Sequence, residues 1–314
     1  MSLLIIATGW HVDSWRERFR QVLPSHEIVA PGDAFDRRRV RYVASWKHPE
    51  GSLSGLPALE AIFSLGAGVD HLFNDPRLPD VPIARVVDPD LTTRMSEYVV
   101  LHCLIGLRQH RRYQRQQSEA LWDDDRHQPA ARDVRVGVLG LGVLGLDAAT
   151  KLRAIGFDVA GWSRSPKPDL GFASHHGEEG LAALLARTDI LVNLLPSTPD
   201  TAGFLNRAVF AGLARDGRLG APQLINAGRG ASQNETDIIA CLDDGTLGHA
   251  TLDVFQQEPL PPVSPFWAHP KVTVTPHNSA MSTPDAVCAL IAEQIKRLER
   301  GEPLQHRVER GRGY

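Results

Sequence analysis

The sequence predicts an α/β fold with parallel sheets, divided into two domains. Short apolar runs alternate with longer amphipathic segments along all 314 residues, which is the pattern of parallel strands joined by helices. A polar stretch interrupts this alternation, and a second series of strands and helices follows it. Because domains usually contain ~100–200 residues, the length also accommodates two of them.

The first domain is expected to contain three strands, at residues 3–8 (LLIIAT), 40–46 (VRYVASW) and 61–66 (AIFSLG). The third strand ends in the glycine-rich turn Gly66-Ala67-Gly68. From Met95 to about Glu119 the pattern predicts one long helix, which is apolar at first and then strongly basic. Ser96 followed by Glu97 supplies its start signal.

The second domain starts after a polar loop at residues 122–133. Six apolar runs follow with helices between them, which predicts a βαβαβ series with its own core. These runs lie at residues 134–140, 157–163, 189–196, 223–228, 249–254 and 271–276. A last helix at 282–300 is expected to return to the first domain. We therefore predict a substrate-binding domain at 1–99 plus 282–314 and a dinucleotide-binding domain at 100–281.

The composition excludes several classes of protein. Apolar residues make up 42% and charged residues 23% of the chain, with a net charge of −3, which gives no general attraction to nucleic acid or anionic membranes. No apolar stretch approaches the ~18–20 residues of a membrane span. Three widely spaced cysteines form no disulfide or metal pattern. We expect a cytoplasmic protein with no metal site, no nucleic-acid partner and no membrane partner.

A glycine-rich motif predicts a dinucleotide site. It follows the apolar run at 134–139 and opens a helical pattern, which is the context that such a motif needs. Its glycines permit a tight turn, a close approach of the backbone to a pyrophosphate and close packing of helix on strand. The alternative is a glycine-rich turn without a ligand. The motif consists of Gly140, Leu141, Gly142, Val143, Leu144 and Gly145.

The end of the next strand indicates which dinucleotide binds. An enzyme that uses NAD places an acidic residue there, about 20 residues after the glycines, to bind the ribose 2′-hydroxyl. This chain instead has Trp162-Ser163-Arg164-Ser165, with Lys167 close behind. Two hydroxyls and a guanidinium suit a 2′-phosphate, so we predict NADPH in preference to NADH, with NADH still usable. An exposed polar turn that selects no cofactor is the alternative.

Three polar residues at the ends of apolar runs suggest chemistry on a small anion. Arg229 follows LINAG, Glu258 closes TLDVFQQE, and His277 ends VTVTPH. Arginine can hold a carboxylate through two parallel hydrogen bonds. Histidine can donate a proton near neutral pH, and a neighbouring glutamate favours its charged form. Taken alone, the three could also be ordinary loop residues.

Seven motifs in order give the chain a resemblance to the D-2-hydroxyacid dehydrogenases, and within them to the glyoxylate/hydroxypyruvate reductase A type. They are SLGAGVDH (64–71), RMSEYVVLHCL (94–104), GVLGLGVLG (137–145), GWSRS (161–165), LLPSTPDTAGFLN (194–206), LINAGRG (224–230) and LDVFQQEPLPPVSPFWAHPKVTVTPH (252–277). The resemblance covers about residues 61–280. It implies two Rossmann-like doubly wound domains with an interdomain cleft, and a homodimer that uses the long helix and the Trp122 loop.

The resemblance also implies roles for individual residues. Arg229 would hold the carboxylate and carbonyl oxygen of a small 2-oxo acid, and His277 would protonate that oxygen as hydride arrives. Glu258 would hold the imidazole and keep it protonated. Related phosphoglycerate dehydrogenases commonly have an arginine where this chain has Ser64, which disfavours a phosphorylated substrate.

Further residues are expected to line the two ligands. Some have an alternative role. Trp46 and Trp267 could serve only core packing, residues 66–68 could form only a tight turn, and Asp253 could only cap the end of a strand. The substrate is expected to contact Trp46, Leu65, Gly66, Ala67, Gly68 and Trp267. Besides the glycine motif and residues 162–165, the cofactor is expected to contact Leu195, Pro196, Thr201, Asn226, Ala227, Gly228, Asp253, Ser279 and Ala280.

The predicted function is therefore NADPH-dependent reduction of glyoxylate or hydroxypyruvate to the D-2-hydroxy acid. A dehydrogenase for a bulkier 2-oxo acid is one alternative. The other is a dinucleotide-sensing binding protein that has kept the fold.

Overall fold

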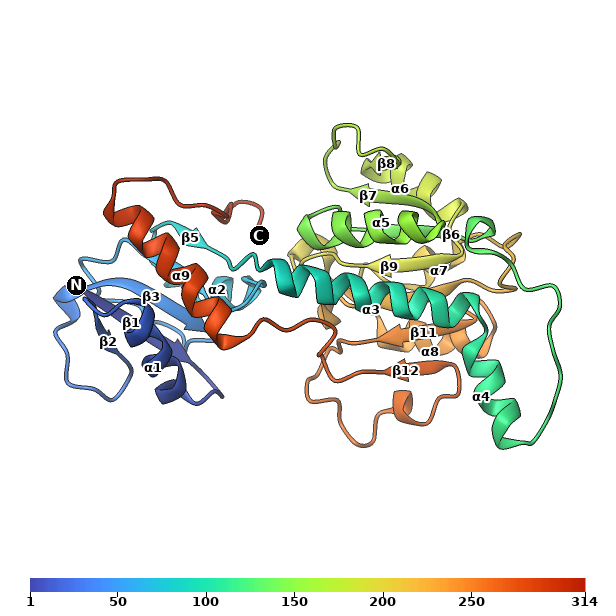
Figure 1. The fold of residues 1–314 in the computed structure, drawn as a ribbon, viewed down its shortest axis with the longest axis horizontal. Helices are drawn as coiled ribbons and strands as arrows, with labels where there is room; N and C mark the ends of the chain where they lie inside the picture. The colour runs from blue at the N-terminus through green and yellow to red at the C-terminus, as the bar shows by residue number, and fades with distance from the viewer. Residues whose placement is uncertain (314) are drawn as a thin grey trace. The chain divides into compact units, whose positions relative to one another are not determined.

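The computed structural model describes residues 1–313 and divides the chain into two compact units (Figure 1). One unit comprises Met1–Leu91 together with the described residues from Met281 onward, and the other comprises Thr92–Ala280. The expected boundary near residue 100 and the expected interdomain cleft stay predictions, as does the assignment of substrate and dinucleotide to separate units.

The first unit contains a five-stranded parallel sheet in the order β2-β1-β3-β4-β5. The three expected strands are confirmed as β1, β3 and β4, whereas β2 and β5 were not predicted because each is only two or three residues long. The bounds are β1 Ser2–Ala7, β2 Glu27–Val29, β3 Val40–Trp46, β4 Ala61–Ser64 and β5 Ile83–Ala84.

Both faces of this sheet are buried, which explains why its strands read as continuous apolar runs. Side chains of β1 alternate between two apolar clusters, with Leu3 and Ile5 in one and Leu4 and Ile6 in the other. Helices α1 (Val12–Val22) and α9 (Pro284–Glu299) pack together on the first cluster, and α2 (Asp70–Phe73) contributes to the second (Figure 1). The predicted last helix is thus confirmed, and it belongs to the first unit.

The second unit contains a seven-stranded parallel sheet in the order β12-β11-β10-β9-β6-β7-β8. The six expected strands are confirmed. An additional edge strand, β8, was not predicted, because its sequence ASHH is polar and only partly buried. The bounds are β6 Arg135–Leu139, β7 Asp158–Ser163, β8 Ala173–His176, β9 Ile190–Asn193, β10 Gln223–Asn226, β11 His249–Leu252 and β12 Val272–Val274.

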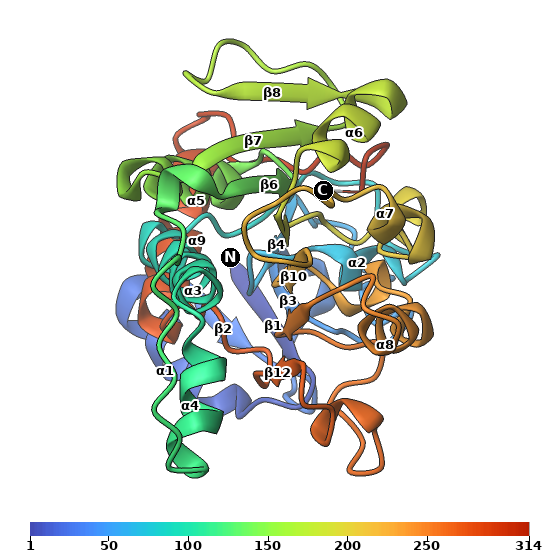
Figure 2. The same cartoon turned by 90° about the vertical axis from the view of Figure 1, so that its right-hand side faces the viewer.

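Helices cover both faces of the second sheet, as Figure 2 shows. On one face lie α3 (Pro89–Leu107) and α5 (Val143–Ile155). On the other lie α6 (Gly177–Ala186), α7 (Arg207–Ala211) and α8 (Glu235–Asp243). In each sheet, successive strands are first added towards one side, and the chain then crosses over and adds the remaining strands on the other side. This single crossover is typical of doubly wound folds. The predicted fold class is therefore confirmed.

The single long helix predicted from Met95 to Glu119 is wrong in two respects. It begins earlier, at Pro89, where the carboxylate of Asp88 accepts a hydrogen bond from the backbone of Asp90; Ser96 instead donates to Asp147. It also breaks at Gln109, whose φ of 50° is left-handed, and α4 (His110–Ser118) follows. The change from an apolar to a basic pattern marks this break.

Short 3₁₀ turns join several of the elements. They are η1 Arg37–Arg39, η2 Ala131–Asp133, η3 Pro199–Thr201, η4 Gly230–Ser232 and η5 Pro265–Trp267. Among the helices of residues 1–313, none combines the length and the apolar character that crossing a membrane requires.

Candidate active site

The strand ends of the second sheet bring the candidate residues to one edge. In the register of the sheet, Leu139 pairs with Asn193, Asn193 with Asn226, Asn226 with Leu252, and Leu252 with Val274. The residues that follow these positions therefore share the carboxyl edge of the sheet. In open α/β sheets this edge is where ligands bind.

The glycine motif forms the turn between β6 and α5. Gly140 has a φ of 96°, and a Cβ there would lie 2.8 Å from the carbonyl oxygen of Leu194. A Cβ on Gly145 would lie 1.9 Å from the carbonyl oxygen of Gly140, so helix and strand pack too closely for a side chain. A Cβ on Gly142 would meet nothing within 4 Å. The turn thus leaves open space in front of the N-terminus of α5, which fits a pyrophosphate.

The end of β7 presents hydroxyl and guanidinium groups without an acidic residue of its own. The side chain of Ser163 is buried and donates to the carbonyl oxygen of Ser165 at 2.8 Å. Arg164 is half exposed and pairs with the exposed Asp200 at 3.4 Å. Trp162 turns inward, where its ring N–H donates to the carbonyl oxygen of Gly177 at 2.9 Å. Arg164 and Ser165 therefore fit a phosphate better than Trp162, and better than Ser163, whose hydroxyl proton is committed to a carbonyl oxygen.

His277 and Glu258 lie in direct contact. Nδ1 of His277 donates to Oε2 of Glu258 at 2.7 Å, while Oε1 of Glu258 accepts from the backbone N–H of Phe255 at 3.0 Å. Because a carboxylate only accepts hydrogen bonds, the contact places a proton on Nδ1 and orients the ring. The imidazole is about half exposed, so Nε2 is left for a ligand.

Arg229 lies in the loop that follows β10, beside the loop that carries Glu258. A Cβ on Gly230 would lie 1.9 Å from the carbonyl oxygen of Phe255, so the two loops are in close contact. The side chain of Gln233 also donates to the carbonyl oxygen of Val254 at 3.0 Å. Nη1 of Arg229 donates to the carbonyl oxygen of Gly228 at 2.8 Å. The structure thus brings all three predicted catalytic residues to the same edge.

Buried amides hold the Arg229 loop in shape. The side chain of Asn226 accepts from Asn193 at 2.9 Å and from the backbone N–H of Gly228 at 3.1 Å, and it donates to Gln233 at 2.8 Å. Asn226 is fully buried and Ala227 is buried beside it. Gly228 is required here, because a Cβ would lie 2.9 Å from both the Asn193 amide nitrogen and the carbonyl oxygen of Leu195.

Asp253 organises the loop that carries His277. Its fully buried carboxylate accepts hydrogen bonds from the hydroxyl of Thr275 at 2.6 Å and from the backbone N–H groups of Asn278 and Ser279 at 3.0 and 3.1 Å. The backbone N–H of His277 donates to the carbonyl oxygen of Asp253 at 2.8 Å. Whether the same carboxylate also contacts a cofactor stays a prediction.

The other residues predicted for this unit have mostly local partners. The hydroxyl of Thr201 donates to the carbonyl oxygen of Pro196 at 2.7 Å. The side chain of Leu195 is buried, and Ala280 packs against the apolar cluster under α3 and α5. Trp267 is about half exposed, and its ring N–H donates to the carbonyl oxygen of Pro261 at 2.9 Å.

In the first unit, Ser64 closes the glycine turn after β4. Its hydroxyl donates to the carbonyl oxygen of Gly68 at 2.7 Å and accepts from the backbone N–H of Gly66 at 3.2 Å. The side chain of Leu65 is buried in the core, so only its backbone can face a ligand. Ser64 therefore shapes the turn through hydrogen bonds at both of its ends.

Trp46 lies against this turn. A Cβ on Gly66 would lie 2.8 Å from Cζ3 of the indole. The ring stacks on Trp10 at 5.1 Å between centroids and meets the edge of His71 at 4.6 Å. These contacts fix the ring at the carboxyl edge of the first sheet.

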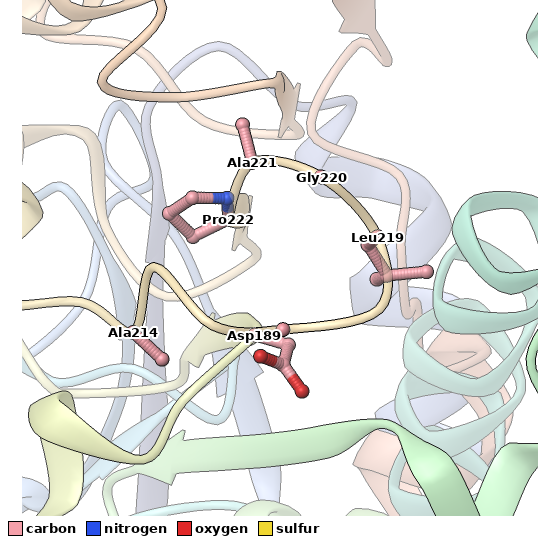
Figure 3. Close-up of a pocket in the computed structure, with 7 residues that line it drawn as sticks. Asp189, Ala214, Leu219, Gly220, Ala221 and Pro222 are labelled. Atoms are coloured by element: carbon pink, nitrogen blue, oxygen red, sulfur yellow. The ribbon is translucent and has the colours of Figure 1, made fainter.

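The hollow drawn in Figure 3 lies at the opposite edge of the second sheet. It is bounded by Asp189, which precedes β9, and by the loop that ends at Pro222, before β10. The carboxylate of Asp189 accepts from the backbone and the guanidinium of Arg135 at 2.8–3.1 Å. Since the hollow leaves no space for a water molecule, we assign it to the fold and not to function.

Comparison with known proteins identifies the family. The model of the NAD-binding domain of D-isomer specific 2-hydroxyacid dehydrogenases matches residues 84–279. This chain belongs to the D-isomer specific 2-hydroxyacid dehydrogenase family. It is therefore an NAD(P)-dependent oxidoreductase, and the resemblance predicted from its motifs is confirmed.

Full-length relatives place the chain near one group of that family. It is 40% identical to glyoxylate/hydroxypyruvate reductase A of Serratia proteamaculans over 311 residues, which cover 96% of each chain. The protein of the same name from Yersinia enterocolitica is 39% identical, with 100% of both chains covered. The chain is thus a 2-hydroxyacid dehydrogenase similar to the glyoxylate/hydroxypyruvate reductases.

Solved structures agree with this placement. An NADPH-dependent glyoxylate/hydroxypyruvate reductase from Sinorhizobium meliloti, in complex with NADP and sulfate, matches with a TM-score of 0.93, 47% identity and 100% coverage of both chains. A probable 2-hydroxyacid dehydrogenase from Rhizobium etli, in complex with NADP, HEPES and L(+)-tartaric acid, matches with a TM-score of 0.94 and 42% identity, covering 100% of this chain and 99% of the other.

Several residues at this edge were not predicted from the sequence. Asn193 could have been found, because it ends an apolar run as Asn226 does. The other three residues carried no such signal. Gln233 lies in a loop, Thr275 lies beside a short edge strand, and Tyr98 lies within a helix. Each of the four forms a hydrogen bond to a segment distant in the sequence.

Proposed function

We propose that this enzyme reduces a small 2-oxo acid, glyoxylate or hydroxypyruvate, to the D-2-hydroxy acid with NADPH. The observation that carries the proposal is the 2.7 Å contact between His277 and Glu258 at the carboxyl edge of the sheet, in the loop next to Arg229. The similar reductase from Sinorhizobium meliloti is NADPH-dependent, which supports the cofactor.

The residues of the second unit fit a dinucleotide. The open space at Gly142 and the N-terminus of α5 would accept the pyrophosphate. Arg164 and Ser165 would bind a 2′-phosphate. The loops at 195–201, 226–228 and 279–280 would line the nicotinamide half. When bound, the cofactor supplies a hydride to the carbonyl carbon of the substrate.

Protein side chains supply the remaining chemistry. Arg229 holds the carboxylate and polarises the carbonyl oxygen through a charged double hydrogen bond. His277 donates the proton on Nε2 to that oxygen, since Nδ1 is committed to Glu258. Glu258 accepts the Nδ1 proton and so fixes the direction of the ring. General acid catalysis of this kind contributes roughly 10²–10⁴-fold to the rate.

In the first unit, we propose that the Gly66-Ala67-Gly68 turn donates backbone N–H groups to the substrate carboxylate. Gly66 already donates to Ser64, so Ala67 and Gly68 are the donors that we expect. Trp46 and Trp267 are proposed to limit the size of the group attached to the carbonyl.

An assay panel tests the proposal. Oxidation of NADPH and of NADH is followed with glyoxylate, hydroxypyruvate, pyruvate and phenylpyruvate. We expect kcat/KM to be highest for NADPH with glyoxylate or hydroxypyruvate. Equal or higher values with NADH would contradict the cofactor assignment, and a preference for phenylpyruvate would indicate a dehydrogenase for bulkier substrates.

A further inference from the structure

The backbone of His277 adopts a conformation that its surroundings must impose. Its φ of 50° lies in the left-handed region, which non-glycine residues seldom adopt. Left-handed backbone persists at a functional residue when the surrounding structure holds it there. The direction of the imidazole, and hence its contact with Glu258, depends on whatever fixes this turn.

Asp253 supplies most of the restraint. Thr275, His277, Asn278 and Ser279 all donate hydrogen bonds to it, three to the carboxylate and one to the backbone carbonyl. The loop from Thr275 to Ser279 therefore wraps around one buried acidic residue. A carboxylate shielded from water forms strong hydrogen bonds with such donors.

Tyr98 extends this network into α3. Its hydroxyl lies 2.8 Å from the hydroxyl of Thr275. The proton of Thr275 is committed to Asp253, which can only accept, so Tyr98 must be the donor to Thr275. Burial raises the pKa of Tyr98, so the phenol keeps its proton. The result is a directed chain from Tyr98 through Thr275 to Asp253.

We propose that Tyr98, Thr275 and Asp253 are positioning residues that hold His277 in the left-handed conformation needed for its contact with Glu258. This inference rests on the proposed function, because it assigns the network a part in proton donation by His277. The hydroxyl of Thr275 is the middle member of this series of hydrogen bonds, because it accepts from Tyr98 and donates to Asp253.

Substitution of Thr275 isolates that hydroxyl. Thr275→Val removes the hydroxyl and keeps the shape of the side chain, whereas Thr275→Ser keeps the hydroxyl. We expect Thr275→Val to lower kcat about tenfold or more, as small misplacements of a catalytic group do. The KM for the 2-oxo acid and the Kd for NADPH should change far less, and Thr275→Ser should restore most of kcat.

A matched control separates positioning from stability. Thr188 is fully buried in the same unit, and its hydroxyl donates to the carbonyl oxygen of Leu184 at 2.7 Å, just before β9 and so at the opposite edge of the sheet. Thr188→Val loses a hydroxyl that is buried more deeply than that of the partly buried Thr275, and it should keep the kcat of the wild type. Tyr98→Phe gives an independent variant, with an expected loss of kcat in the same direction as Thr275→Val.

A double-mutant cycle decides whether the network acts through His277. In a His277→Ala background, Thr275→Val should cause no further loss of the residual kcat. An equal loss with and without His277, or a loss confined to the Kd for NADPH, would overturn the inference. Wild-type kcat in both Thr275→Val and Tyr98→Phe would also overturn it. If the proposed function itself fails, His277→Ala alone keeps its activity, so the two failures are distinguishable.

Discussion

At the scale of single residues, the proposed mechanism gives separate tasks to the two ring nitrogens of His277. Nδ1 is held by a carboxylate that is itself anchored to the backbone of Phe255, and Nε2 is the proposed donor to the substrate. Arg229 lies in the adjoining loop. Each side chain is thus oriented by contacts within the protein.

Removal of the charge on Glu258 should slow the reaction. In Glu258→Gln a neutral amide replaces the carboxylate that accepts from Nδ1 of His277, and a neutral acceptor holds that N–H less strongly. We therefore expect kcat for 2-oxo acid reduction to fall, while the Kd for NADPH changes far less. The measurement compares both constants with those of the wild type, and an unchanged kcat would contradict it.

The sequence predicted which residues end the strands, but not how they are connected. Arg229, Glu258 and His277 could be found because each closes an apolar run, and parallel strands bring such ends together. Asn226 and Asp253 were found in the same way, yet their role in the hydrogen bonds of the loops could not be predicted. Those bonds join side chains that only the three-dimensional fold brings into contact.

At the scale of elements, the edge formed by β11 and β12 contains a partly buried arginine beside two buried histidines. Arg111, from α4, donates to the hydroxyls of Thr251 and Thr273 at 2.9–3.0 Å. Burial, followed by the charge of Arg111, lowers the pKa of His249, in β11, to about 3 and that of His102, in α3, to about 4. The two histidines are therefore neutral in the folded protein.

These histidines should make the second unit sensitive to acid. A group whose pKa is lowered by folding binds a proton more readily in the unfolded chain, so stability is lost as pH falls below 6.5 towards the folded value. At about 1.4 kcal/mol per pH unit, His249 alone would remove roughly 3 kcal/mol by about pH 4.

Substitution of His249 tests this sensitivity. His249→Gln removes the titrating group, so its free energy of unfolding should fall less than that of the wild type between pH 7 and pH 4. The free energy of unfolding is measured by urea-induced unfolding of the full-length protein at several pH values. His127→Gln, at an exposed histidine, is the control and should follow the wild type; identical pH dependence in His249→Gln would refute the explanation.

Local sequence accounted for the long elements better than for the short ones. The buried strands were predicted because they are apolar on both faces, whereas β2, β5 and β8 are too short or too polar for that pattern. The break at Gln109 could not be predicted from helix propensity, because the residues on both sides favour a helix. It depends on the packing of α4 against β11 and β12 through Arg111.

At the scale of the whole molecule, we expect a homodimer, as the family resemblance implies. Trp122 is 96% exposed in the loop after α4, and Leu121 beside it is also exposed. Neighbouring exposed apolar side chains such as these are a candidate site of association with a partner. Light scattering should give twice the chain mass of 34.4 kDa, and Trp122→Ser should weaken the association; a monomeric wild type would contradict the expectation.

The central claim is that His277 is the proton donor of this 2-hydroxyacid dehydrogenase, and kinetics of His277→Ala test it most directly. The variant should be compared with the wild type for kcat with glyoxylate and hydroxypyruvate, and for the Kd of NADPH. The account predicts that kcat falls at least about 100-fold while NADPH binding is retained. A variant that keeps most of its kcat would contradict the account.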